Sequence, residues 1–357
     1  MAEANVRAKI STQQVGADRL PYRPSWIDGL TEWVRRLPLP AWAFYLAVGA
    51  ILTLLVTFLS WAGELAAAGA LPLFGGLSTL TGVYVLALLH YLDDSAAAAL
   101  KRFRPVMTVD EAEYARLYYQ FTTMPPGPVL IANGVGAFYA LVLVLAFGAA
   151  NPILSGGVIS PVQVVVLLFS SLFSYTLTGA MIYHTIHQLR LVNYIYTHHT
   201  RINLFQPGPM YALSRLAART AIGLSIPTYV WFQVTTSSSS RAPLEMPFFA
   251  ILIGLTFVWP LVGAHGLLEK EKERLKDEVS KRIEATIVEL HIRVDAGEMQ
   301  NRDALKDTLD GLVAEQGVID KLRTWPWQTQ TVSGLGVALL LPIIIWVIQR
   351  VLERIGV

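Results

Sequence analysis

Three histidines near the end of the fourth long apolar run are the first candidates for chemistry. His184 and His187 are three residues apart, a spacing that puts both on one helix face and suits two metal ligands. His198 lies further along the same predicted helix. Histidine also titrates near neutral pH, so pH sensing is an alternative to metal binding. A third interpretation is structural, with the histidines lying among lipid headgroups. We therefore treat all three as candidates for pH sensing or metal binding, and we expect no cofactor.

Two arginines fall inside the fifth apolar segment. Arg215 and Arg219 are four residues apart and share a helix face. A charge inside a membrane is costly and indicates a function, here an anion path or a buried ion pair. A helix that begins later in the chain would instead leave both arginines outside the hydrocarbon. Polar side chains of other segments could line the same path, so the candidate ion path comprises Arg215, Arg219, Asn133, Ser174 and Thr178.

An acidic pair follows the second apolar segment. Asp93 and Asp94, with His90 one turn earlier, could bind a divalent cation. A metal-dependent enzyme would need a second acidic cluster that this chain does not offer at a suitable place. We therefore interpret the pair as a helix end that returns to water.

Motifs and composition exclude several classes of function. The chain has no cysteine and a formal net charge of only +2, which argues against thiol chemistry and against nucleic acid as a partner. It contains no phosphate-binding loop, dinucleotide fingerprint, nucleophile elbow or zinc-protease motif. We therefore expect that the protein is not an enzyme.

Hydropathy predicts an all-α, polytopic membrane protein. The chain is 54% hydrophobic and only 15% charged, whereas a soluble domain carries about a quarter charged residues. Seven apolar segments have the roughly 20 residues that a bilayer requires. The second is interrupted by Pro72, Gly75 and Gly76, so the stretch 64–90 is either a full span or a re-entrant pair. The expected spans are 41–63, 70–90, 129–149, 161–183, 211–233, 247–267 and 330–350.

Lysines and arginines predict the orientation. They gather in alternate loops, and the opposite loops contain only Arg241, which is the positive-inside pattern. The N-terminus is then cytoplasmic and, with seven spans, the C-terminus lies outside, in a multi-pass protein of the plasma membrane. Residues 1–20 read as a disordered tail.

Residues 21–40 predict a short amphipathic helix at the membrane surface. Ser25 and Asp28 have the spacing of a capping box, which places the helix start at Trp26. Asp28 is expected on the polar face, together with Glu32, Arg35 and Arg36. The opposite, apolar face is expected to comprise Trp26, Ile27, Leu30, Trp33, Val34 and Leu37.

The segment 268–325 predicts a cytoplasmic helical hairpin. Apolar residues recur at spacings of three, four or seven among charges of both signs, as in a coiled coil, and residues 295–298 read as a turn. The domains are thus the tail, the surface helix, a membrane domain over 41–267, the hairpin, and a final span with a short tail over 326–357.

These features favour transport through the membrane. We expect a homo-oligomeric ion channel in the lipid bilayer, with cytoplasmic helices used for assembly or gating. The alternative is a scaffold or sensor whose 268–325 hairpin binds a soluble protein partner. A membrane metalloenzyme or a secondary transporter fits the sequence less well, because the transporter would normally need a buried ionisable relay.

Overall fold

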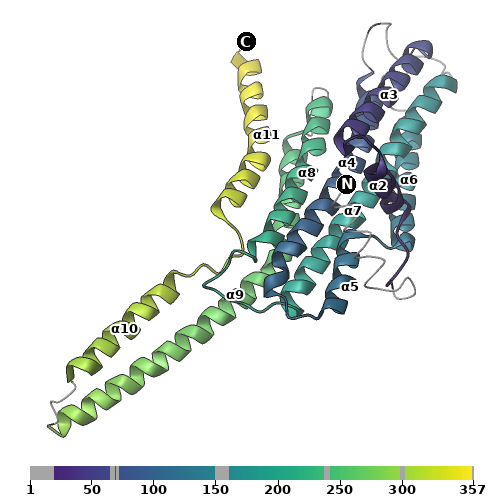
Figure 1. Ribbon diagram of the computed structural model, residues 1–357. Helices are drawn as coiled ribbons and strands as arrows, with labels where there is room; N and C mark the ends of the chain where they lie inside the picture. Colours follow the sequence, from purple (N-terminus) through teal and green to yellow (C-terminus); the bar gives the residue numbers. More distant parts are fainter. Residues whose placement is uncertain are drawn as a thin grey trace.

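The computed structural model describes residues 20–64, 69, 72–148, 161–236, 242–297 and 302–355. These residues form helices and connecting turns, and no strand occurs among them (Figure 1). The predicted disordered tail lies outside the described residues apart from Leu20. In chain order the helices are α2 Trp26–Arg36, α3 Ala41–Ala62, α4 Leu73–Phe103, η2 Arg104–Val106, α5 Glu111–Thr122, α6 Pro126–Gly148, α7 Pro161–His198, α8 Tyr211–Thr236, α9 Ala242–Asp295, α10 Arg302–Lys321 and α11 Thr329–Ile355.

Four helical stretches are long and apolar enough to cross a membrane within the described residues. They are Ala41–Ala62, Phe74–Val106, Glu111–Leu145 and Pro161–His198, so the coarser prediction of an all-helical chain that contains helices suited to span a membrane is confirmed. The fifth predicted segment forms α8, whose first half carries two arginines. The described apolar part of α11, Thr329–Leu340, is shorter than a span.

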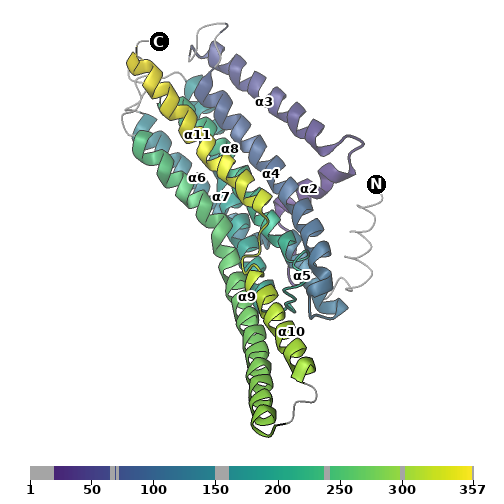
Figure 2. The same ribbon diagram turned by 90° about the vertical axis from the view of Figure 1, so that its left-hand side faces the viewer.

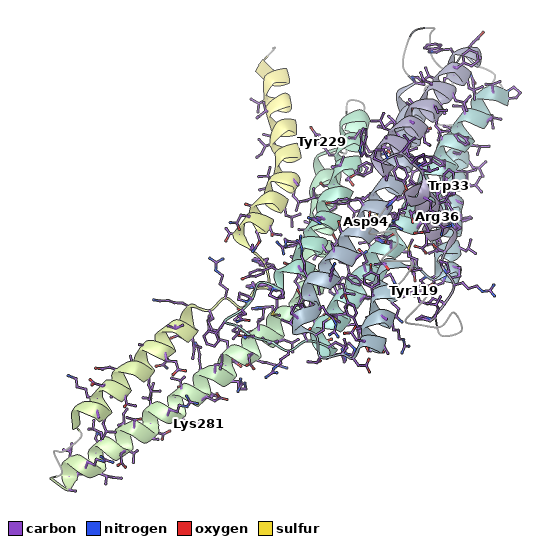
Figure 3. All side chains as sticks on the ribbon, in the orientation of Figure 1. Trp33, Arg36, Asp94, Tyr119, Tyr229 and Lys281 are labelled. Carbon is purple, nitrogen blue, oxygen red and sulfur yellow. The ribbon has the colours of Figure 1, made fainter. Side chains whose placement is uncertain are left out.

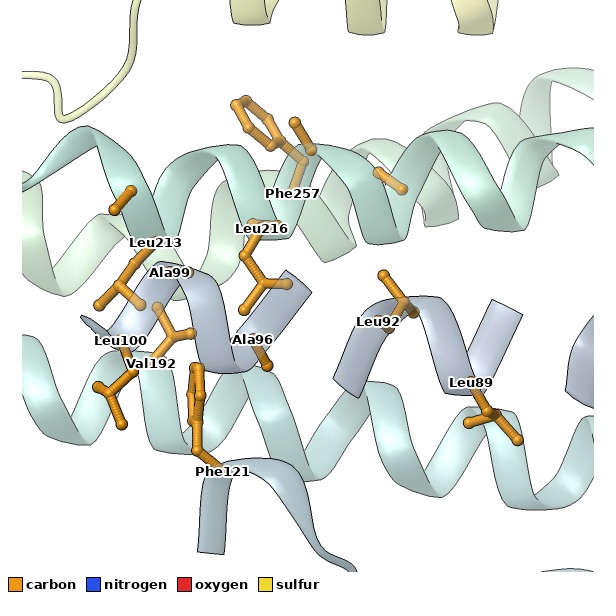
Figure 4. Close-up of a cluster of buried hydrophobic side chains, with 14 of the residues drawn as sticks. Leu89, Leu92, Ala96, Ala99, Leu100, Phe121, Val192, Leu213, Leu216 and Phe257 are labelled. Carbon is orange, nitrogen blue, oxygen red and sulfur yellow. The ribbon is translucent and has the colours of Figure 1, made fainter. Parts of the chain in front are cut away.

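Helix α4 lies at the centre of the packing. Its buried residues Leu89, Leu92 and Leu100 contribute to a continuous core with residues of α5, α7, α8 and α9 (Figure 4). Although Gly75 and Gly76 follow Pro72, α4 is one unbroken helix of 31 residues, so these glycines do not interrupt the second apolar segment. A proline inside a helix would interrupt it, but Pro72 directly precedes the first turn of α4, where a proline is tolerated.

Helices α6 and α7 approach each other through glycine. A Cβ atom built on Gly136 of α6 would lie 2.1 Å from the backbone oxygen of Tyr175. A Cβ atom built on Gly179 of α7 would lie 2.2 Å from the backbone oxygen of Ala132. Small residues of this kind let helix backbones approach closely, and the resulting van der Waals packing contributes to helix association in lipid.

The amphipathic helix α2 forms where the sequence predicts it. Ser25 is the N-cap, and the reciprocal hydrogen bonds of the capping box with Asp28 are present. Ile27 and Val34 are fully buried, as expected. Asp28 is also buried, so the prediction that it lies on the solvated face is wrong. The reason is tertiary: the amide nitrogen of Met124, just before α6, also donates to its carboxylate.

Helix α9 extends far beyond the bundle. It is one helix of 54 residues, and its distal half pairs with α10 in a projecting hairpin (Figures 1 and 2). Lys272 Nζ donates to the carbonyl oxygens of Asp320 and Leu322 at 2.8 Å, and Lys276 forms an ion pair with Asp320. These contacts fix the register of α10 before the chain turns into α11.

Candidate functional site

A buried aspartate and a buried histidine meet between α4 and α7. His184 Nε2 lies 3.0 Å from Asp93 Oδ1, and the two side chains are only 2% and 3% exposed. The interpretation of Asp93 as a helix end returning to water is therefore wrong. A carboxylate at such a site needs a partner because its desolvation is costly, and the imidazole supplies one.

Helix α2 brings a second carboxylate to this pair. Asp28 Oδ2 accepts hydrogen bonds from Ser25 N at 2.8 Å, Ser25 Oγ at 2.7 Å and Met124 N at 3.0 Å. Burial, reinforced by the negative charge of Asp93, raises the pKa of the Asp28 carboxyl from 3.8 to about 6, although the three hydrogen bonds oppose the rise. Asp28 thus lies within electrostatic reach of Asp93, and burial favours its protonated form more than it would be favoured in water.

The site continues toward the surface through charged and aromatic partners. Arg35 of α2 donates to Asp94 Oδ1 at 3.1 Å, and the Asp94 side chain is half exposed. Tyr45 of α3 lies with its hydroxyl 3.1 Å from His90 Nδ1. In Figure 3, Asp94 and the helix-α2 residues Trp33 and Arg36 lie at the same level of the bundle. Helices α2, α3 and α4 are therefore joined by polar contacts at this level.

Buried polar atoms without a partner gather on the adjoining turn of α7. His184 Nδ1, Thr185 Oγ1 and both amide atoms of Gln188 form no hydrogen bond among the described residues. Each of these side chains is at most 4% exposed. His184 and Gln188 are one helical turn apart and share a face. Buried polar groups are normally hydrogen-bonded, so this turn of α7 has unused capacity to bind polar atoms.

Arginines gather on a second, exposed face. Arg219 of α8 donates to Ser95 Oγ at 3.2 Å, and its guanidinium lies 5.9 Å from the ring centre of Tyr91 on α4. Arg215 is close enough to Arg219 and to Arg102 of α4 to be repelled by both. Within the part of the chain that the structure describes, no salt bridge neutralises these three arginines. The α4–α8 face therefore carries an uncompensated positive charge.

The five residues predicted to line an ion path do not lie together at one place in the structure. Arg215 and Arg219 lie on the α4–α8 face, whereas Ser174 is buried on α7. The Thr178 hydroxyl donates to the backbone oxygen of Ser174. Asn133 lies on α6 and contacts α2 and α7. With its amide oriented to satisfy both neighbours, it accepts from the Trp26 indole at 2.8 Å and donates to the Thr176 carbonyl at 3.1 Å.

The three predicted histidines are also separated. His187 Nε2 lies 3.0 Å from the backbone oxygen of Gln120 on α5. His198 lies beside the hydroxyl of Thr197, and its position fourteen residues after His184 puts it roughly 20 Å further along α7. No group of three or more potential metal ligands occurs within the described ranges. Only His184 joins the buried site.

The sequence patterns do not indicate Asp28, Thr185 or Gln188 as site residues. Asp28 had a complete local explanation as a capping residue, so nothing indicated a tertiary role. The one available signal was the position of Gln188, which follows His184 by four residues on a helix where both must face the same neighbour.

Comparisons with known protein families, curated proteins and solved structures found no match.

Proposed function

We propose that this chain is a membrane protein of the transport class that assembles as a homo-oligomer and conducts anions. One observation carries the proposal: Arg102, Arg215 and Arg219 form a positive cluster without an acidic partner on the described α4–α8 face. Like charges held together repel one another, and the repulsion is relieved when an anion binds between them. Arginine is also well suited to hold anions through several donors at once.

The location of the cluster supports a shared path. Tyr91 of α4 is 49% exposed and Arg219 of α8 is exposed, although we propose that both helices cross the membrane. Facing lipid, such a polar strip would be costly, whereas facing water between copies of the chain it would be solvated. We infer that the α4–α8 face of each copy turns toward the axis of the oligomer.

The proposed topology has seven spans. Helices α3, α4, α6, α7, α8, α9 and α11 would cross the membrane, with the N-terminus cytoplasmic and the C-terminus outside. This arrangement keeps the α9–α10 hairpin and most lysines and arginines on the cytoplasmic side of the plasma membrane.

Removal of the arginine charge should change ion selectivity. In liposomes that contain the purified protein, Arg219→Ala is expected to lower chloride permeability relative to potassium by about fivefold, since one nearby charge is worth on the order of 1 kcal/mol in water. The measurement is the reversal potential under a salt gradient. Arg116→Ala is the matched control, because Arg116 lies on α5 and pairs with Glu113. Unchanged selectivity in Arg219→Ala would remove this residue from the path.

The projecting hairpin favours a second candidate, a scaffold. Val288 and Ile292 lie one turn apart on α9 and are 50% and 59% exposed, so they could bind another protein. Under the channel proposal the hairpin assists assembly, and deleting 269–323 is expected to lower the mass of the particle in detergent. A deletion variant of unchanged oligomeric state would favour a soluble partner at the hairpin.

A further inference from the structure

Asp28 is a buried polar contact between α2 and the rest of the bundle. Its Oδ2 atom accepts all three hydrogen bonds, from the Ser25 amide, the Ser25 hydroxyl and the Met124 amide. Its Oδ1 atom is buried and has no hydrogen-bond partner. A carboxylate with one unpartnered buried oxygen is favoured as the neutral acid, because protonation removes the charge that burial penalises.

The groups around Asp28 add negative charge to the site. Asp93 of α4 repels it, and His184 of α7 contacts Asp93 from the other side. Tyr22, ahead of α2, and Tyr119 of α5 also lie within electrostatic reach, but phenols are neutral at physiological pH. His187, one turn after His184 on α7, lies within electrostatic reach of Asp93 and His184, and its ring contacts the backbone oxygen of Gln120. Arg35 is engaged with Asp94 and Glu32.

We propose that Asp28 is a buried proton-binding site beside the Asp93–His184 pair, and that proton binding there tightens the docking of α2 onto the bundle. The site joins three elements distant in sequence, so a change in its charge is felt at the contact between α2, α4 and α7. The inference does not depend on anion conduction.

The direction of the pH effect follows from the change in the pKa of Asp28 when α2 docks. Its carboxyl has a pKa of about 6 when α2 is docked, and it would return to near 3.8 in water if α2 detached. The docked form therefore binds the proton more tightly. The resulting stabilisation is complete below pH 3.8 and is lost as the pH rises through about 6. Between these limits the docking constant increases about tenfold for each unit of acidification.

Hydrogen exchange of the full-length protein in detergent tests the proposal. The amides of Met124 and Ser25 report docking, because Met124 donates to Asp28 and Ser25 donates to the backbone oxygen of Met124 as well as to Asp28. After correction for the intrinsic pH dependence of exchange, their protection is expected to be roughly tenfold greater at about pH 5 than above about pH 6. Protection that does not change with pH would overturn the proposal.

Two substitutions and one control separate the site from a general effect of acid. Asp28→Asn resembles the protonated acid, so high protection at every pH is expected. Loss of protection at every pH would instead show that docking needs the charge, which contradicts the proposal. Asp93→Asn should move the response to lower pH, because Asp93 no longer repels the Asp28 charge. Asp110→Asn, at the exposed N-cap of α5, should respond as the unaltered protein does, and a lost response there would contradict a local site.

Discussion

Replacing Asp93 with leucine is expected to lower the free energy of unfolding by about 3–5 kcal/mol, because the change leaves the buried His184 imidazole without its partner. His184→Leu should cost a similar amount by leaving the carboxylate unpartnered. The double variant is expected to recover most of the loss, since a buried polar pair is often replaced by apolar residues at little cost. The measurement is a double-mutant cycle from unfolding in mixed detergent.

Asp94 provides the control for this cycle. It is the next residue on α4, but its side chain is 51% exposed and pairs with Arg35. Ion pairs at such sites contribute at most about 1 kcal/mol, so Asp94→Leu should have a small effect. If the losses from Asp93→Leu and His184→Leu simply added in the double variant, the two side chains would not act as a pair.

Alanine at Gly179 is expected to destabilise the protein by about 1–3 kcal/mol or more, because its Cβ atom would be forced against the backbone of α6. Backbone atoms cannot move aside as a side chain can, so α6 and α7 would have to separate. Gly136→Ala should have the same effect from the opposite helix. Thermal unfolding of the purified protein measures both.

Gly134 provides a control that separates the close approach of α6 and α7 from a general effect of replacing glycine. It lies two residues from Gly136 on the same helix, and a Cβ atom there would meet nothing within 4 Å. Gly134→Ala should therefore be neutral or stabilise the protein by about 0.5–1 kcal/mol, the usual gain from removing a glycine within a helix. A destabilisation of equal size at Gly134 and Gly136 would show that the close approach of α6 and α7 is not the cause.

Features that depend on local spacing could be predicted from the sequence. The start of α2 at Trp26 follows from the Ser25–Asp28 capping box, and the turn after α9 follows from the turn-forming residues that begin at Asp295. Both are determined by neighbouring residues, and no tertiary contact is needed to specify them.

Features that depend on which helices meet could not be predicted in this way. Two adjacent aspartates on a helix point in different directions, and the sequence does not reveal that α7 covers Asp93 while Asp94 remains half exposed. The burial of Asp28 similarly depends on the amide of Met124, 96 residues away. Helical periodicity states which residues share a face, but it does not state what that face contacts.

The Asp93–His184 pair beside the proton-binding site and the arginine cluster both involve neighbouring residues of α4. Asp93 faces α7, whereas Ser95 contacts Arg219 of α8. A change at the buried site could thus reach the proposed ion path through one helix. The hydrogen-exchange and permeability experiments are independent, so either proposal can fail alone.

The mass of the purified protein in detergent, measured by light scattering with the detergent contribution subtracted, decides whether the chain assembles as a homo-oligomer. We expect a particle containing several copies of the 39.3 kDa chain. A particle with the mass of a single chain would contradict a path shared between copies.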